Sequence, residues 1–214
     1  MKTKHTYTLR RLSALLLALT MTFALAGCSE KPFDAAGYVD ASMKLVTTGD
    51  SKALEAYKGE AVVEAVEDYD AEMQDLVKSV TGDLELSESN QTLVKDLVKE
   101  LLGSASYKVG EATEKDDGSY EVPLTVQPLQ LNIADEITQW IQTLDAEKIN
   151  DMDALYGEIF QMMKTAVAKK EYGEEKQYTL NVAKNDDGLY DVTNDDLEKL
   201  GEELFTTDLD DLMG

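Results

Sequence analysis

The sequence predicts an α+β fold, in which helices pack on a small antiparallel sheet built from two β-hairpins. Over most of the chain, apolar residues recur with the 3.6-residue period of an amphipathic helix. In two stretches the period changes to two, which is typical of half-buried strands. Each of these stretches contains the tripeptide Asp-Asp-Gly, at 116–118 and at 186–188. Asp-Gly favours a tight hairpin because the central positions of that turn need positive φ.

Four helices with apolar faces are expected before the first hairpin. Asp34 is a candidate N-cap for the first helix, and Gly49 is placed to end it. Asp50 or Ser51 can cap a short second helix. The four helices are expected at 34–49, from Asp50 or Ser51 to Tyr57, at 60–80, and from Ser87 or Ser89 to Gly103.

The first hairpin is expected to pair a strand through Tyr107 and Val109 with a strand over 120–126. In the second strand, apolar residues alternate with polar ones, as one buried face requires. Pro123 interrupts this strand and cannot donate to a ladder. The strand is therefore expected to lie at a sheet edge, or to pair at Pro123 only through the carbonyl.

The second half of the chain repeats the order of helices followed by a hairpin. Asn194 is expected to cap a last amphipathic helix, and an acidic tail follows at 208–214. The expected elements are helices at 132–146 and 153–172, strands at 178–182 and 190–192, and a helix from Asn194 through Phe205.

The two hairpins share a phrase, Asp116-Asp117-Gly118-Ser119-Tyr120-Glu121-Val122 and Asp186-Asp187-Gly188-Leu189-Tyr190-Asp191-Val192. An internal duplication would explain this repeat. Two independent tight hairpins with a tyrosine after the turn would explain it equally well, because Asp-Gly is the strongest short hairpin signal.

The N-terminal segment has the parts of a secretory signal. A basic start precedes an apolar stretch from Leu12 to Ala26, which is too short for a comfortable membrane span of about 20 residues. The run Leu25-Ala26-Gly27-Cys28 closely resembles the lipobox of bacterial lipoproteins, and Cys28 is the chain's one cysteine. The resemblance implies that the Cys28 thiol carries a diacylglyceryl group. We therefore expect a lipoprotein signal peptide at 1–27, a lipidated N-terminus and short linker at 28–33, and a single α+β domain at 34–207.

The composition of residues 28–214 limits the partners and the catalytic chemistry that this part of the chain can have. The signal carries four of the 20 basic residues and none of the 43 acidic ones, so the rest has a formal net charge of −27. Nucleic acid is excluded as a partner, because binding phosphates needs clustered cations. Both arginines and the one histidine also lie in the signal. Histidine- or thiol-based catalysis and zinc sites cannot be built without those side chains.

Carboxylates are the remaining candidates for catalysis or metal binding. Adjacent acids occur as Asp116/Asp117, Asp186/Asp187, Asp195/Asp196, Glu174/Glu175 and Glu202/Glu203. Turn chemistry, helix N-termini and solvation explain each pair without catalysis. We therefore predict no catalytic residues, no cofactor and no metal site.

Two other patterns have structural explanations. Asp151-Met152-Asp153 begins like a calcium loop, but Leu155 and Tyr156 occupy positions that need a ligand and a glycine. Helix-spaced aromatics more often belong to a core than to a ligand cleft. The aromatics considered for a sugar or peptide cleft are Trp140, Tyr38, Tyr57, Tyr69, Tyr107 and Tyr156.

The order of elements from Phe33 to Phe205 resembles uncharacterised lipobox-containing lipoproteins of clostridia-like Gram-positive bacteria. The resemblance rests on Phe33-Asp34-Ala35-Ala36-Gly37-Tyr38-Val39, on Gly49-Asp50, on Tyr172-Gly173-Glu174-Glu175-Lys176, and on the Asp-Asp-Gly turn before the last helix. It implies a surface location and an architecture but no activity. Helices followed by antiparallel strands also resemble cystatin-like and nuclear-transport-factor-like folds, from which the long helical insert departs.

We therefore expect a lipoprotein anchored on the extracytoplasmic face of the cell membrane through lipidated Cys28. It is expected to act as a non-enzymatic binding or interaction module for an unknown protein or glycan ligand. The alternative is a carboxylate-dependent hydrolase acting on envelope glycans. A concave aromatic pocket with an inward carboxylate would favour the hydrolase, and a filled core would favour the binding module.

Overall fold

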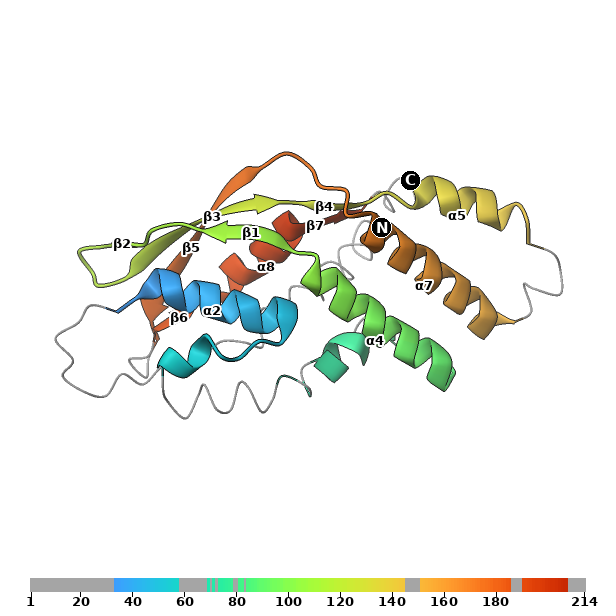
Figure 1. Cartoon of the computed structure of the whole chain (residues 1–214), viewed down its shortest axis with the longest axis horizontal. Helices are drawn as coiled ribbons and strands as arrows, with labels where there is room; N and C mark the ends of the chain where they lie inside the picture. Colours follow the sequence, from blue (N-terminus) through green and yellow to red (C-terminus); the bar gives the residue numbers. More distant parts are fainter. Residues whose placement is uncertain are drawn as a thin grey trace, which may run out of the picture.

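The two expected hairpins lie side by side in one antiparallel sheet (Figure 1). The computed structural model describes residues 33–57, 69, 71, 73–78, 81–82, 84–144, 151–185 and 190–207. The strand order is β1-β3-β5-β6, and β2 also pairs with β3. The strands are β1 (Ser106–Val109), β2 (Thr113–Glu114), β3 (Tyr120–Gln127), β5 (Lys176–Lys184) and β6 (Tyr190–Val192).

The sheet has one apolar face, as the alternation in the sequence predicts. Along β3, every second side chain from Tyr120 to Val126 is buried. Val122 lies opposite Leu180 of β5 in the antiparallel register, and both side chains are fully buried. On the other face, the Gln177 side chain donates a hydrogen bond to Thr125. One face of the sheet therefore belongs to the core and the other is polar, which is common for antiparallel sheets.

Strand β3 is central, so the expectation that Pro123 lies in an edge strand is wrong. The second expectation for Pro123 is confirmed, because its carbonyl accepts a hydrogen bond from the Gly110 amide at 2.7 Å. The pairing of β1 and β2 with β3 is interrupted opposite Pro123. A Cβ on Gly110 would lie only 2.9 Å from the Pro123 ring. The missing donor is thus tolerated because the neighbouring strand is broken at the same level.

Six named helical segments lie in the described part of the chain, and the predicted N-caps of two of them, α2 and α4, are confirmed. The Asp34 side chain accepts from the Gly37 amide, and Gly49 ends the first helix in the left-handed conformation (φ +70°). Ser87 caps α4 in the same way as Asp34 caps the first helix. The segments are α2 (Ala35–Thr48), the 3-10 helix η1 (Leu54–Tyr57), α4 (Glu88–Gly103), α5 (Ala134–Ile141), α7 (Met152–Lys169) and α8 (Asn194–Leu204).

Several predicted boundaries are wrong by a few residues. The cap of α8 is Thr193 rather than Asn194, because the Thr193 hydroxyl accepts from the Asp196 amide. Helix α7 ends at Lys169, and its C-cap Lys170 adopts φ +52°, so Tyr172 lies outside the helix. Of the expected third helix at 60–80, the described positions from 69 onward are helical, and Gly82 (φ +58°) follows.

A second, small sheet was not predicted. It consists of two parallel strands, β4 (Leu129–Leu131) and β7 (Phe205–Thr207). Phe205, expected in the last helix, instead pairs with Leu129, and both side chains are buried. Three-residue strands are too short to show a period in the sequence, so only the long-range pairing reveals them.

Helices cover the apolar face of the main sheet, and a helical pair extends beyond it. Helices α2 and α8 contact strand β3, and α4 packs against α7 (Figure 1). The buried hydrophobic residues form one cluster that includes side chains from Ala35 to Phe205. Residues 1–32, with Cys28, and the acidic tail at 208–214 lie outside the described residues.

The tight turn before β3 can be tested by a substitution at Gly118. Gly118 has φ +80°, and no atom lies within 4 Å of the position that a Cβ would take there, so a side chain would meet backbone strain but no clash. We expect Gly118→Ala to lower the free energy of unfolding by about 1 kcal/mol, because L-residues resist the left-handed region. Gly103→Ala is the matched control, since its φ is not positive and its new methyl would make ordinary contacts. Equal denaturation midpoints for the two variants would contradict the assigned turn.

Candidate functional site

The tyrosines that follow the two Asp-Asp-Gly tripeptides in the sequence meet at one end of the sheet. Their ring centroids are 5.6 Å apart, between Tyr120 and Tyr190. The Phe33 ring stacks on Tyr190 at 4.1 Å and meets Tyr120 edge-on at 5.8 Å. Tyr38 and Tyr57 complete this aromatic cluster around Phe33. The repeated phrase of the sequence therefore has a shared structural role, which is to hold the start of the folded chain against both hairpins.

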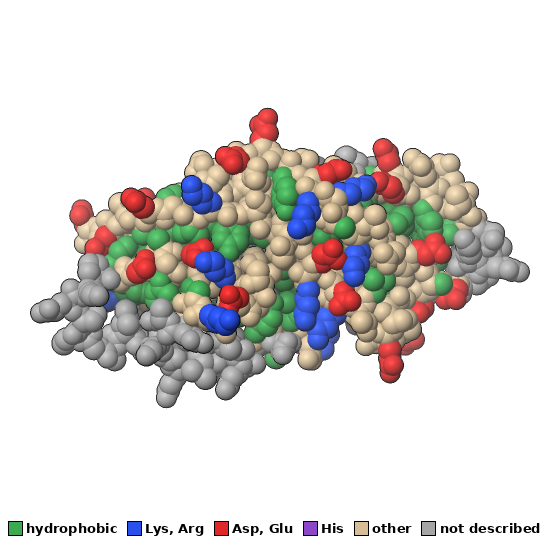
Figure 2. Space-filling model, viewed as in Figure 1, with side chains coloured by type: hydrophobic (Ala, Val, Ile, Leu, Met, Phe, Trp, Pro, Cys, Tyr) green, Lys and Arg blue, Asp and Glu red, His purple; other side chains and the backbone are tan. Residues whose placement is uncertain are grey.

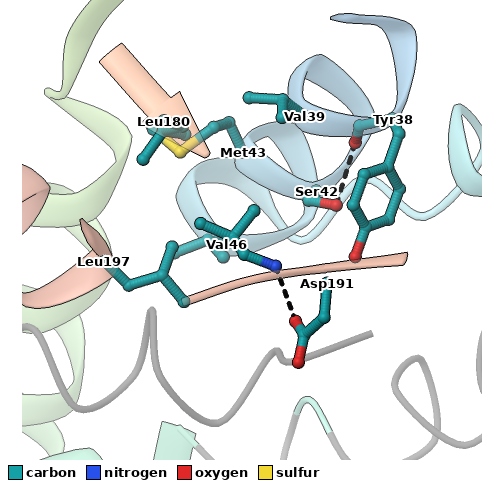
Figure 3. Close-up of a pocket in the computed structure, with 9 residues that line it drawn as sticks. Tyr38, Val39, Ser42, Met43, Val46, Leu180, Asp191 and Leu197 are labelled. Atoms are coloured by element: carbon teal, nitrogen blue, oxygen red, sulfur yellow. Dashed lines mark hydrogen bonds between the residues drawn. The ribbon is translucent and has the colours of Figure 1, made fainter. Parts of the chain in front are cut away.

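A narrow cleft lies next to the aromatic cluster, between α2, β5, β6 and the start of α8 (Figure 3). Its walls are mostly apolar and buried, and one carboxylate, Asp191, faces it. The residues that line it are Tyr38, Val39, Ser42, Met43, Val46, Leu180, Asp191, Val192 and Leu197.

The surroundings of Asp191 shift its pKa. The side chain is half-buried, and this burial raises the pKa of Asp191 above its usual value, although the Val192 amide donates a 2.7 Å hydrogen bond to the carboxylate. The Tyr38 hydroxyl points toward Asp191 (Figure 3). Burial and the nearby Asp191 charge also raise the pKa of Tyr38. At neutral pH the cleft therefore presents a protonated phenol beside a carboxylate that is harder to ionise than usual.

The size of the cleft limits what it can do. The space open to water is about 30 Å³, which is room for about two water molecules. A retaining or inverting glycosidase needs a second carboxyl at roughly 5–10 Å from the first. Among the described residues that line the cleft, Asp191 is the single carboxylate. In this conformation the cleft can bind water but cannot admit a sugar ring.

The predicted carboxylate pairs do not converge on this cleft. Asp117 accepts from the amide and hydroxyl of Ser119 within the first turn, which lowers the pKa of Asp117. Asp196 accepts from the backbone and side chain of Asn181, so it joins α8 to β5. Glu203 forms an ion pair with Lys176 at 2.6 Å. Glu174 and Glu175 are exposed, and Asp186 and Asp187 lie outside the described residues.

The acids considered for calcium have structural roles. Asp151 caps α7 by accepting from the Ala154 amide. Asp153 accepts from the Ser87 amide and from the buried side chain of Asn90, which joins the first turns of α4 and α7. These hydrogen bonds lower the pKa of Asp153. Over the described ranges, no three acidic, cysteine or histidine residues are grouped so that they could hold a metal ion.

The aromatic residues considered for a ligand cleft are not all brought together. Tyr38 and Tyr57 lie near Phe33, whereas Trp140 donates from its indole to Glu158, and Tyr156 packs near Phe160 at 6.4 Å. Trp140 lies on α5 and Tyr156 on α7, so neither belongs to the cleft.

Asp191 itself was missed. Its place in the alternating strand predicts a solvent-facing acid, like Glu121 at the equivalent position of the first phrase, which pairs with Lys115. Asp191 instead faces a cleft that side chains of α2, among them Tyr38, also line, and it is half-buried there. No local signal distinguishes the two positions.

Comparisons with known proteins give one fold likeness. No family model matches the chain, and no curated protein sequence matches it. Among solved structures, the fold is similar to the crystal structure of a "putative lipoprotein (ycdA)" from Bacillus subtilis, with 16% sequence identity and a TM-score of 0.51. The match covers 82% of this chain and 57% of that chain, so the present chain spans little more than half the length of that protein. At this identity the comparison shows a shared α+β fold.

Proposed function

We propose that this chain is a lipoprotein, anchored on the extracytoplasmic face of the cell membrane through Cys28, and that it acts as a binding module without enzymatic activity. The observation that carries the proposal is the Leu-Ala-Gly-Cys box, in register after a basic start and an apolar stretch. Two acyl chains, at about 0.8 kcal/mol per buried methylene, would hold the protein far better than one. The fold likeness to a putative lipoprotein supports this location.

Binding is favoured over catalysis by the side chains of residues 29–214. This segment contains no histidine, arginine or cysteine, so acid-base work would depend on carboxylates, lysines and tyrosines. Several of the acids already have structural roles in turns, helix starts or ion pairs, namely Asp117, Asp153, Asp196 and Glu203.

None of the helices in the described ranges has the length and apolar character that a membrane span requires.

The hydrolase alternative has one specific observation in its favour, which is the half-buried Asp191 beside Tyr38 in an apolar cleft. A carboxyl with a raised pKa is a candidate general acid. The alternative requires the cleft to open and a second carboxylate to approach Asp191.

The anchor is tested by replacing the thiol. We expect Cys28→Ala to abolish fatty-acid labelling and to release the protein from the membrane fraction or leave its signal uncleaved, because only the thiol can form the thioether. Ser29→Ala is the matched control and should keep both properties. Undiminished fatty-acid labelling of Cys28→Ala in metabolic labelling with an alkyne fatty acid would refute lipidation at Cys28.

The variant Asp191→Asn tests whether burial in the cleft raises the pKa of Asp191. The raised pKa means that the folded state favours the protonated acid, so the stability that Asp191 contributes is present below about pH 4 and lost as pH rises through its folded pKa. The variant should therefore gain stability over wild type between pH 4 and neutrality, measured by thermal unfolding across pH. Glu121→Gln, at the equivalent position of β3, should not show this gain, because Glu121 forms an ion pair with Lys115 outside the cleft.

The same pair of variants tests for catalysis. We expect the purified protein to show no turnover of envelope glycans or chromogenic glycosides, with or without Asp191. Turnover by wild type that disappears in Asp191→Asn and persists in Glu121→Gln would establish the hydrolase instead.

A further inference from the structure

The carboxylate of Asp191 faces the cleft, and no lysine is among the described residues that line it. Its Oδ1 atom accepts a hydrogen bond from the Val192 amide, whereas Oδ2 accepts none from a described residue (Figure 3). At the equivalent position of the first hairpin, Glu121 forms an ion pair with Lys115 at 2.5 Å. The second hairpin therefore has the carboxylate of this arrangement without a described cationic partner.

Burial without a neighbouring cation destabilises the charged form of Asp191. Loss of hydration is the cause that raises the pKa of this half-buried side chain. A positive charge held against Oδ2 would offset the loss, whereas an acid on the open surface stays hydrated and gains little from a partner. The cleft is thus a place where a bound cation stabilises the folded chain.

Three side chains of the cleft carry oxygen atoms that can accept hydrogen bonds, namely Asp191, Tyr38 and Ser42. The Tyr38 hydroxyl points toward Asp191 (Figure 3). The Ser42 hydroxyl uses its proton to donate to the Tyr38 carbonyl at 2.9 Å, so it meets a ligand as an acceptor. A primary ammonium group has three N–H donors and no acceptor, which matches this set of oxygens.

The size and the walls of the cleft select a small aliphatic amine. The space open to water, about 30 Å³, admits an ammonium group, which is about as large as a water molecule. A quaternary ammonium or a planar guanidinium group is larger than this space. The walls are aliphatic and can contact the methylene groups next to the nitrogen; they are formed by Val39, Met43, Val46, Leu180 and Leu197.

The net charge of the molecule favours cationic ligands over anionic ones. Residues 28–214 carry a formal charge of −27. Figure 2 shows acidic side chains spread along the face that it draws, whereas lysines gather over its middle. An excess of negative charge raises the local concentration of small cations.

The cleft also lies near the point where the proposed anchor joins the domain. Tyr38 lines the cleft, and its ring centroid is 5.6 Å from that of Phe33. Cys28 precedes Phe33 by five residues, which span at most about 18 Å when fully extended. With Cys28 lipidated, an amine on a lipid headgroup can therefore compete with a soluble amine for the cleft.

We infer that the cleft beside Asp191 binds the primary ammonium group of a small aliphatic amine. The ammonium lies against Asp191 Oδ2 and donates to the hydroxyls of Tyr38 and Ser42, while the adjoining methylenes contact the aliphatic walls. This inference rests on the proposed binding function and names the chemical group that is bound. The amine belongs to a soluble compound or to a zwitterionic lipid headgroup, and only the second source depends on the lipid anchor.

A titration in solution tests which group is recognised. The full chain is labelled with ¹⁵N-valine, purified in detergent, and titrated with ethylammonium chloride at constant ionic strength. We expect a saturable shift of the Val192 amide resonance, because this amide donates to the Asp191 carboxylate. Half-saturation should occur at about millimolar concentration or above, since so small a ligand has little binding free energy. Tetramethylammonium chloride and potassium chloride, which have no N–H donor, should not produce the shift.

Three variants show whether the amine lies in the cleft. Asp191→Asn should abolish the saturable shift, and Tyr38→Phe should raise the half-saturation concentration several-fold, because it removes one acceptor and keeps the ring. Glu121→Gln is the matched control and should bind like wild type, since Glu121 pairs with Lys115 outside the cleft. Thermal unfolding of each variant reports whether it is folded.

Nanodiscs separate the two sources of the amine. A shift that is already present in discs containing phosphatidylethanolamine, but absent from phosphatidylcholine discs, would assign the ligand to the lipid headgroup. A shift that appears in both kinds of disc only after ethylammonium is added would assign it to a soluble amine.

The absence of any saturable shift, an equal shift with tetramethylammonium or potassium, or unchanged binding by Asp191→Asn would each overturn the inference. Fatty-acid labelling of wild type and Cys28→Ala reports separately on the anchor, so a failure of the cleft to bind amines is distinguishable from a failure of the lipid attachment.

Discussion

Pairing of β3 with β5 is the contact on which the other layers depend. It joins the two hairpins through seven consecutive residue pairs and places Val122 beside Leu180 on one face. Without it, each hairpin would be a two-stranded unit of marginal stability. The continuous apolar face that results is wide enough for α2 and α8 to pack side by side, and the cleft at Asp191 is the small gap that remains between them.

Local chemistry made much of this fold predictable, whereas contacts between distant segments did not. Asp34, Gly49 and Ser87 begin or end helices through their own side chains or backbone freedom, so their roles could be inferred from a few neighbours. The β4–β7 pair and the central position of β3 depend on residues far apart in the sequence. Pro123 shows the difficulty, because a broken neighbouring strand removed the conflict that the sequence suggested.

The candidate site was less predictable than the fold for the same reason. The acids that attract attention in the sequence occur in adjacent pairs, and adjacency on a turn or helix start usually reflects local hydrogen bonding. Asp191 differs from Glu121 only in what lies above it, and α2 is supplied by a segment about 150 residues earlier in the chain. The missing histidine, arginine and thiol were more informative than any acid present, since they limit the available chemistry wherever the chain folds.

The stacking of Phe33 on Tyr190 joins the first described residue to the last strand of the main sheet. If the chain is exported N-terminus first, as the proposed signal peptide requires, Phe33 emerges long before Tyr190. A contact of such long sequence separation forms late, because loop closure must precede it. If the lipid is attached as the N-terminus emerges, the chain is already held at the membrane while its first aromatic residue still waits for the second hairpin. Folding is then completed next to the bilayer, where the growing excess of negative charge keeps the unfinished sheet away from the lipid surface.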